Sequence, residues 1–304
     1  MSEREALVLA ADIGGTHMRA ALVDDRGEVL IHRTVPTPAH DDAPRALVDL
    51  IRAVKDMSGQ RVPCHAVVGL PGVVDYDAGR FLWAPHLPET WPELLSVGAL
   101  ASGLDLPVFI ANDADLAAVG EATFGAGAGS PDVAYLTIST GIGAGVMCGG
   151  RLLRGRRSLG EVGHTVIAWQ QWCAGGPSTL EELGSGSGMA REAAAAGLGD
   201  LDAQAIFDAA SRGDRRARDI WDRAVLACAV GVCNLVMTFS PSMVVIGGGI
   251  GRRSEFFRAV RQTVVCRPQH HPADLSIVTS TLGDEAGLVG AAGWVTAISP
   301  SSKG

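Results

Sequence analysis

Lysine is almost missing from this chain. Only Lys55 and Lys303 occur among its 25 lysine and arginine residues, and neither follows a glycine-rich loop. This excludes a P-loop nucleotide site, whose GxxxxGK[ST] motif needs a lysine directly after the glycines. A protein kinase with its strand lysine, or an enzyme that forms a Schiff base, is equally hard to build from these two positions.

Positive charge and long apolar runs are also scarce. The formal net charge is −8 and the sequence pI is about 5.5, so no overall field attracts nucleic acid. The N-terminus has no basic segment followed by a long apolar stretch, and we therefore expect no signal peptide. Apolar runs fall well short of the ~20 residues of a membrane helix. These features predict a cytoplasmic protein without nucleic-acid or membrane partners.

Closely spaced cysteine pairs are absent as well. The six cysteines lie in apolar segments without CxxC spacing, at positions 64, 148, 173, 228, 233 and 266. This scatter is typical of reduced, buried thiols in a cytosolic protein rather than of a disulfide framework.

The pattern that is present alternates strands and helices. An antiparallel meander opens the chain, and a strand, a glycine turn and a second strand recur in the second half. The expected strands cover 6–11, 18–24, 28–35, 64–75 with a break at Pro71-Gly72, 106–111, 133–138 and 243–251. The expected helices cover 43–58, 114–125, parts of 188–238, and 285–298. Two similar β units suggest two related α/β domains that face a cleft.

Glycine turns follow three of the expected strands, at 12–16, 139–145 and 247–251. Glycines let backbone N–H groups close on an anionic oxygen without obstruction by side chains. Any one of these turns could simply need a positive φ. The three together favour a shared phosphate or nucleotide site, although none completes the GxGxxG motif of dinucleotide-binding folds.

Acidic residues mark the remaining candidates. Asp113 follows the strand 106–111, where open α/β sheets place their ligands, but Asp113 or Asp115 could equally cap the next helix. Glu161 and His164 lie together in GEVGH. There they could bind a metal, hold a sugar hydroxyl or satisfy a loop carbonyl.

Taken together, these motifs resemble the ROK family of sugar kinases and repressors, within the actin-like ATPase superfamily. The resemblance covers essentially the whole chain and is carried by DIGGT (12–16), GLPGVVD (69–75), ANDADLAAVGEATFGAG (111–127), the segment from ISTGIGAG to GEVGH (138–164) and VVIGGGIG (244–251). It implies an α/β fold with two actin-like (ribonuclease H-like) domains flanking a cleft, and mixed sheets with helices on both faces. The implied small domain spans 1–113 plus 287–304, and the large domain spans 114–286.

The resemblance also implies an ATP-dependent hexose kinase in which Asp113 is the general base. Implied sugar-binding residues are Gly72, Asn112, Asp113, Glu161, His164 and Glu181. Implied ATP-binding residues are Asp12, Gly14, Gly15, Thr16, Thr140, Gly141, Gly248 and Gly249. Asp12 would orient Mg²⁺ through water. Phosphoryl transfer depends mainly on such positioning and charge.

One loop departs from the family pattern. In the family that this chain resembles, many members carry the motif CxCGxxGCxE after the GH histidine, and its three cysteines complete a Cys₃His zinc site with that histidine. This chain has Trp172, Ala174 and Thr179 at the three cysteine positions. Cys173 falls between them, so at most two ligands remain with His164, and a structural zinc needs four. We therefore predict no zinc. Something else must orient His164, such as packing around Trp169.

The predicted reaction is transfer of the γ-phosphoryl group of ATP to the 6-OH of glucose or a related hexose, in a homodimer or homotetramer. Mannose, an N-acylated hexosamine and 3-amino-3-deoxyglucose stay open as acceptors, and polyphosphate stays open as donor. The main alternative is a sugar-binding regulator without kinase activity. Repressor relatives carry a DNA-binding domain ahead of the first phosphate motif, which here begins within the first dozen residues.

Overall fold

The computed structural model describes residues 6–38, 42–84, 90–267, 269 and 272–299. Lys303 and the outermost residues of the predicted small domain lie outside these ranges. The chain divides into two compact units, the first made of residues 1–131, 147–159 and 284–304 and the second of residues 132–146 and 160–283. The chain thus crosses between the units several times.

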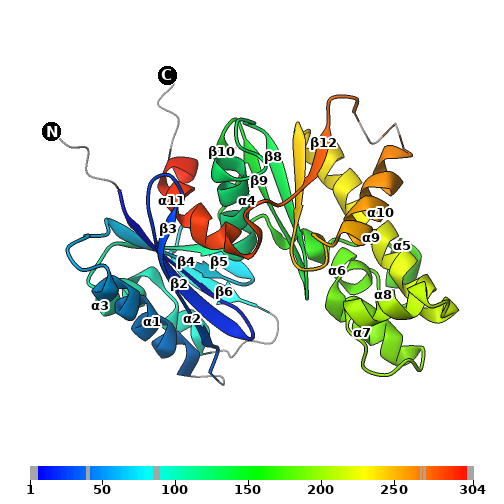
Figure 1. Cartoon of the computed structure of the whole chain (residues 1–304), viewed down its shortest axis with the longest axis horizontal. Helices are drawn as coiled ribbons and strands as arrows, with labels where there is room; N and C mark the ends of the chain where they lie inside the picture. Colours follow the sequence, from blue (N-terminus) through cyan, green and yellow to red (C-terminus); the bar gives the residue numbers. More distant parts are fainter. Residues whose placement is uncertain (1–5, 39–41, 85–89, 268, 270–271, 300–304) are drawn as a thin grey trace. The chain divides into compact units, whose positions relative to one another are not determined.

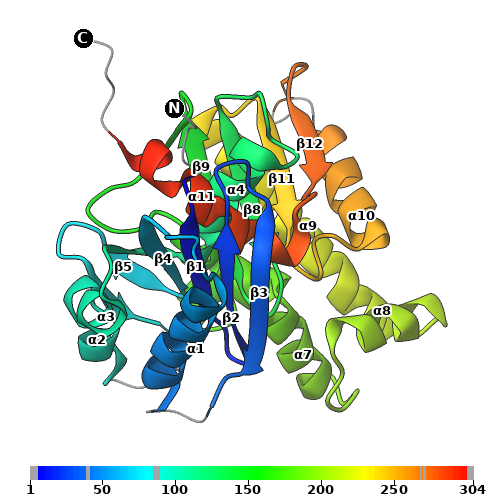
Figure 2. The ribbon, with the colours of Figure 1, turned by 60° about the vertical axis from the view of Figure 1, so that its left-hand side comes forward.

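The first unit is built on a five-stranded mixed sheet of order β3-β2-β1-β4-β7. Its strands are β1 (Val8–Ile13), β2 (His17–Val23), β3 (Val29–Pro36), β4 (His65–Leu70) and β7 (Val108–Asn112). The first three are antiparallel, which confirms the predicted meander (Figure 2), whereas β1, β4 and β7 are parallel. The carboxyl ends of β1, β4 and β7 therefore meet at one edge of the sheet.

Helices cover both faces of this sheet (Figure 1). The elements are α1 (Ala43–Met57), α2 (Trp91–Leu94) and α3 (Val97–Leu104) on one side, and α4 (Asp113–Phe124) and α11 (Ala286–Ile298) on the other. Alternation along β1 decides which side chains meet them, because successive residues of a strand point to opposite faces. Leu9 and Ala11 join the core that contains Leu47 of α1, while the Cβ of Asp12 lies on the α4 side, beside Gly69 and Leu116.

The pair α4 and α11 packs unusually closely. A Cβ atom added at Gly120 of α4 would overlap the backbone of Ala286 and Gly290. One added at Gly290 of α11 would overlap the carbonyl of Leu116. The two helix backbones are thus in direct contact, and only glycine fits at this crossing.

The remaining small elements of the first unit lie beside the main sheet. They are the hairpin of β5 (Val73–Asp75) and β6 (Arg80–Trp83) and the 3₁₀ turn η4 (Gly283–Glu285) that leads into α11. The short strand β10 (Arg151–Leu152) instead pairs antiparallel with the end of β9 (Ile142–Cys148), at the edge of the second five-stranded sheet. The predicted break of the strand 64–75 at Pro71-Gly72 is confirmed: it separates β4 from β5, because Gly72 has a φ of +79° and turns the chain.

The second unit contains the parallel strands β8 (Val133–Ile138), β11 (Met243–Gly247) and β12 (Ser276–Thr279), with β9 (Ile142–Cys148) beside β8. Its helices surround α9 (Arg215–Phe239), which packs on β8 and against α6 (Leu180–Gly184), α7 (Gly186–Ala195), α8 (Ala203–Ser211) and α10 (Ser254–Val265). The 3₁₀ turn η2 (Glu161–His164) and the short helix α5 (Trp169–Cys173) complete the unit.

Helix α9 is long and apolar enough to cross a membrane by composition alone, yet 67% of its most apolar window is buried within the protein. Such burial is what a central helix of a packed domain shows. Asp214 caps its first turn by accepting hydrogen bonds from Arg216 N and Ala217 N.

Some expectations from the sequence were incomplete. Strands β6 and β12 and helices α2, α3 and α10 were not predicted, since they are short or lie between stronger patterns. The prediction of buried thiols is wrong for most cysteines: Cys228 and Cys233 are buried, whereas Cys64, Cys148, Cys173 and Cys266 are exposed free thiols.

Candidate active site

A cavity of about 480 Å³ opens in the first unit where β1 ends. It is lined by Asp12, Ile13, Gly14, Gly15, Thr16, His17, Arg19, Thr34, Asp113 and Asp284. The turn after β1 is closed by a hydrogen bond from Gly14 N to His17 O of 2.9 Å, and Thr37 ties it down by donating to Gly14 O. The structure therefore brings the first predicted phosphate turn and Asp113 together around one cavity.

Asp12 is held by an arginine that the sequence analysis missed. Arg19 stands opposite Asp12 in the β1–β2 register and donates from Nε to Oδ1 at 3.0 Å and from Nη2 to Oδ2 at 2.6 Å. Burial raises the pKa of the Asp12 carboxyl, and the Arg19 guanidinium opposes that rise. Arg19 also donates to the backbone oxygen of Asp284. The signal that could have found it is cross-strand pairing over the tight turn.

This pairing bears on how Asp12 could serve Mg²⁺. A carboxylate has about four lone-pair sites, and Arg19 uses two of those on Asp12. The others can accept hydrogen bonds from water, and protein-bound Mg²⁺ usually keeps several waters. The residues present therefore fit a hydrated Mg²⁺ contacted through water.

At the end of β7, Asn112 and Asp113 divide two tasks. Asn112 is the N-cap of α4: its Oδ1 accepts from Ala114 N at 2.9 Å and from Asp115 N at 3.1 Å. The Asn112 Nδ2 donates to Gly72 O at 2.9 Å. Asp113 is exposed in the first turn, with Oδ1 accepting from Ala114 N at 2.8 Å. The alternative that Asp113 is the helix cap is therefore wrong.

Two buried polar side chains, Tyr76 and Asp115, support the start of α4. Tyr76 donates its hydroxyl to Asp115 Oδ2 at 2.5 Å and accepts from Asn112 N at 3.2 Å. Asp115 is fully buried, and burial raises the pKa of Tyr76 well above its usual value. The pair braces the N-terminus of α4, and the sequence analysis assigned no role to Tyr76.

Gly72 is required by the backbone. Its φ is +79°, and a Cβ there would overlap Trp83 O and the Cα and Cβ of Ala84. Its carbonyl receives the Asn112 amide, so this glycine helps to hold Asn112 in place. A direct sugar contact of Gly72 stays a prediction.

In the second unit, the acidic and histidine candidates form one cluster. His164 Nε2 lies 3.5 Å from Glu161 Oε2. Burial raises the pKa of Glu161, which His164 opposes and the neighbouring Glu181 reinforces. Glu181 Oε2 accepts from Ile142 N at 2.8 Å, beside Gly141 of the second glycine turn. Three predicted sugar-binding residues thus lie together against that turn.

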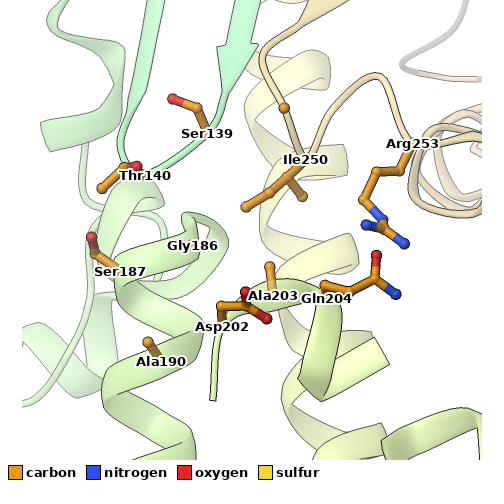
Figure 3. Close-up of a pocket in the computed structure, with 11 residues that line it drawn as sticks. Ser139, Thr140, Gly186, Ser187, Ala190, Asp202, Ala203, Gln204, Ile250 and Arg253 are labelled. Atoms are coloured by element: carbon orange, nitrogen blue, oxygen red, sulfur yellow. The ribbon is translucent and has the colours of Figure 1, made fainter. Parts of the chain in front are cut away.

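A second cavity, of about 440 Å³, lies in the same unit (Figure 3). It is lined by Ser139, Thr140, Gly186, Ser187, Ala190, Asp202, Ala203, Gln204, Gly249, Ile250 and Arg253. Thr140 and Gly249 were predicted as nucleotide-binding. Gly248, with a φ of +79°, has no room for a Cβ against Ile138, so the third glycine turn packs directly on the end of β8.

Several polar residues of this cavity were missed by sequence reasoning. Arg253 places its guanidinium carbon 5.6 Å from the centre of the Phe207 ring, and Figure 3 shows it pointing toward Gln204. Asp202 caps α8 by accepting from Ala205 N at 2.8 Å. The one available signal was the position of Arg253, two residues after the GGGIG turn. A cation and neutral hydrogen-bonding groups together suit a nucleotide.

The loop predicted to lack zinc has little aromatic packing. Trp169 and Trp172 are 69% and 62% exposed, so most of each indole faces solvent. Among the described residues, no group of three or more His, Cys, Asp or Glu side chains could hold a metal ion. Thr179 instead caps helix α6.

Comparison with known proteins gives this arrangement a family. A family model described as ROK family matches residues 8–298. The chain belongs to the ROK family. The match includes both cavities and every residue that the sequence analysis assigned to the site.

Two relatives show how similar the chain is to other proteins of the family. The chain is 37% identical over 297 residues to the bifunctional enzyme NanE/NanK of Brucella melitensis, a match that covers 94% of this chain and 53% of that protein. It thus spans about half the length of that relative. It is 33% identical to a glucokinase of Thermotoga maritima, over 94% of this chain and 96% of the relative.

Solved ROK structures share the fold. A ROK hexokinase from Thermus thermophilus matches with a TM-score of 0.81 and 32% identity, over 94% of this chain and 96% of that one. A ROK family glucokinase from Streptomyces griseus, in complex with glucose and AMPPNP, matches with a TM-score of 0.76 and 30% identity, over 94% of this chain and 98% of that one. The predicted α/β fold class, with actin-like mixed sheets, is confirmed.

Proposed function

We propose that this protein is an ATP-dependent hexose kinase that transfers the γ-phosphoryl group to a sugar hydroxyl. The observation that carries the proposal is the cavity of the first unit. There Asp113 and the turn of Gly14, Gly15 and Thr16 line one space. A carboxylate beside a phosphate-binding turn is what an in-line transfer to a hydroxyl requires.

In this proposal Asp113 accepts the proton of the attacking sugar hydroxyl. Asn112 and Gly72 hold the start of α4, and therefore Asp113, in place. A general base contributes about 10²–10⁴-fold to the rate, and the remainder comes from positioning and charge. Glu161, His164 and Glu181 are proposed to bind sugar hydroxyls, since carboxylates and imidazole can accept hydrogen bonds from them.

The phosphates are assigned to the glycine turns. Backbone N–H groups and the hydroxyls of Thr16 and Thr140 would donate to phosphate oxygens. Gly141, Gly248 and Gly249 would let the nucleotide approach the backbone. Asp12, whose carboxyl group is paired with Arg19, would hold Mg²⁺ through water. The metal would supply positive charge that offsets the charge of the transferring group.

Relatives support glucose as the first acceptor to test. One relative is a glucokinase, and a solved relative binds glucose together with an ATP analogue. A relative from Shigella flexneri, 33% identical, is an N-acetylmannosamine kinase, which keeps N-acylated hexosamines open, and mannose and 3-amino-3-deoxyglucose remain candidates. We further propose that the protein works in the cytoplasm as a homodimer or homotetramer, which light scattering of the purified protein would test.

The decisive experiment is ADP release from ATP and Mg²⁺ with a panel of glucose, mannose, glucosamine, N-acetylated hexosamines and 3-amino-3-deoxyglucose. Turnover on one sugar well above the rest supports the kinase and identifies its acceptor. Polyphosphate in place of ATP tests the donor in the same assay. Sugar binding by calorimetry without turnover would favour the regulatory alternative and overturn the proposal.

A further inference from the structure

The segment between η2 and α6 folds back on itself. Residues Val166 and Thr179 form an antiparallel bridge. Ile167 N donates to Ser178 O at 2.9 Å, and Leu180 N donates to Thr165 O at 3.0 Å. The residue after His164 is thus joined by a hydrogen bond to the residue before Glu181.

A single carboxylate fixes the end of this loop at the start of α6. Glu182 Oε2 accepts from Ser178 N at 2.9 Å, from Thr179 N at 2.9 Å and from Thr179 Oγ1 at 3.0 Å, and Glu182 N donates back to Thr179 Oγ1 at 3.2 Å. Hydrogen bonds to an ionised oxygen are roughly twice as strong as neutral ones. These hydrogen bonds lower the pKa of the Glu182 carboxyl group, and the largest contributions come from Ser178 N and then Thr179 N.

The closed loop holds the candidate sugar-binding residues at a fixed spacing. Thr165, bonded to Leu180, also donates from N and from Oγ1 to Val162 O inside η2. On the other side, Glu181 is tied to Ile142 N. A Cβ at Gly163 would overlap Ile142 O and come within 3.3 Å of the Cβ of Glu181, so η2 and α6 are packed together.

We propose that Thr179 and Glu182 form a hydrogen-bonded clamp that positions His164 and Glu181 for sugar binding. The backbone hydrogen bonds from Ile167 to Ser178 and from Leu180 to Thr165 join this end of the loop to the residues that follow His164, and the clamp fixes that end at the start of α6. Thr179 and Glu182 are both positioning residues. This inference rests on the proposed function, because it concerns the sugar side of that site.

A capping box can also act on stability alone, because it satisfies backbone N–H groups at the start of a helix. The two roles differ in what they change. A purely structural cap alters unfolding and leaves the Michaelis constants alone. A positioning clamp alters the KM for the sugar and spares the KM for ATP.

The test compares four clamp variants with one matched control. Glu182→Ala and Thr179→Val remove the clamp, whereas Glu182→Gln weakens it and Thr179→Ser keeps the hydroxyl. Asp214→Ala is the control, because Asp214 caps α9 in the same unit with two similar hydrogen bonds.

We expect Glu182→Ala and Thr179→Val to raise the sugar KM by about tenfold to a hundredfold, as small displacements of positioned groups do, with the ATP KM within about twofold. Thr179→Ser should stay close to wild type and Glu182→Gln should fall between. Asp214→Ala should lower the melting temperature and leave both KM values unchanged. An equal rise of both KM values, or the same sugar effect in Asp214→Ala, would overturn the positioning role.

Amide hydrogen exchange tests the clamp independently of the kinase assay. The amides of Ser178, Thr179 and Leu180 should exchange faster in Glu182→Ala than in the wild type, and Asp214→Ala should leave them protected. If the wild type binds glucose but turns over no sugar, the proposed function fails while calorimetry with Glu182→Ala still judges the clamp. Unchanged exchange and unchanged glucose affinity in Glu182→Ala would sink the clamp and leave the kinase proposal standing.

Discussion

At the end of β7, Asn112 supports the backbone and Asp113 is placed for chemistry. Asn112 spends its amide oxygen on capping α4 and its amide nitrogen on Gly72. Tyr76 and Asp115 brace the same turn from the core. Asp113 is exposed beside the glycine turn of the first cavity, and this placement suits a residue that takes up a proton.

Asp113→Asn should therefore abolish transfer while sparing the fold. We expect kcat to fall by at least about 10²-fold, since the amide cannot accept the proton, with sugar affinity within about tenfold of wild type. ADP release and calorimetry measure the two quantities. Asp56→Asn, an exposed carboxylate on α1, should change neither. Retained turnover in Asp113→Asn would remove this residue as the base.

Arg253 offers a residue-scale test of the nucleotide cavity. Arg253→Ala should raise the KM for ATP by about threefold to tenfold, because a cation held on the Phe207 ring is lost from the lining. The KM for the sugar should stay constant. The matched control is Arg258→Ala on α10, the helix that follows Arg253, since Arg258 donates to Ser254 and is not among the residues that line the cavity. Equal effects of both variants would show that general charge, rather than this position, matters.

Among the elements, the crossing of α4 and α11 is the most constrained. Gly290→Ala should destabilise the protein by about 1–3 kcal/mol or more, because the new methyl group meets the Leu116 carbonyl, which cannot rotate away. Thermal or urea unfolding measures the loss. Gly98→Ala on α3, with no neighbouring atom within 4 Å, should instead be neutral or slightly stabilising. Similar stabilities of the two variants would contradict the packing account.

The stability that the Glu182 carboxylate contributes at the start of α6 should depend on pH. Hydrogen bonds from Ser178 and Thr179, with the charge of Arg191 on α7, lower the pKa of Glu182 in the folded protein. A lowered carboxyl pKa contributes stability that is present above the unfolded pKa and is lost as pH falls through the folded pKa. The melting temperatures of wild type and Glu182→Gln should thus differ at neutral pH, and the difference should shrink as the pH falls below the unfolded pKa of about 4.3. A constant difference would contradict this account.

For the whole molecule, metal content is the simplest test. Elemental analysis of the purified protein should find no stoichiometric zinc, because Trp172, Ala174 and Thr179 cannot supply thiolates. Chelation should therefore leave the melting temperature unchanged. One equivalent of bound zinc would overturn our interpretation of the loop.

Much of the fold followed from local pattern. The meander of β1 to β3 and helices α1, α4 and α11 were predicted within one or two residues, because apolar periodicity and turn residues act over short distances. The domain boundary at residue 113 stays a prediction. Strand β12 was missed because it has only four residues, whereas helix α10 was overlooked although Phe256, Val260 and Val264 recur at helical spacing.

The candidate site divides in the same way. The glycine turns, Asp113 and the GEVGH cluster were visible as motifs. Arg19, Tyr76, Gln204 and Arg253 were not, because each is defined by what it touches: Arg19 by strand register, Tyr76 by a buried carboxylate, Arg253 by an aromatic ring.

The sequence by itself determined the family, the alternation of strands and helices and the residue types available for phosphate and sugar. Those properties depend on motif order and on contacts between near neighbours. Only the tertiary structure decided that Asn112 caps α4, that Arg19 pairs with Asp12 and that Leu180 bonds to Thr165 and so closes the loop beside His164. Each of these depends on directional hydrogen bonds of about 3 Å, and such bonds form only once folding has placed donor and acceptor together.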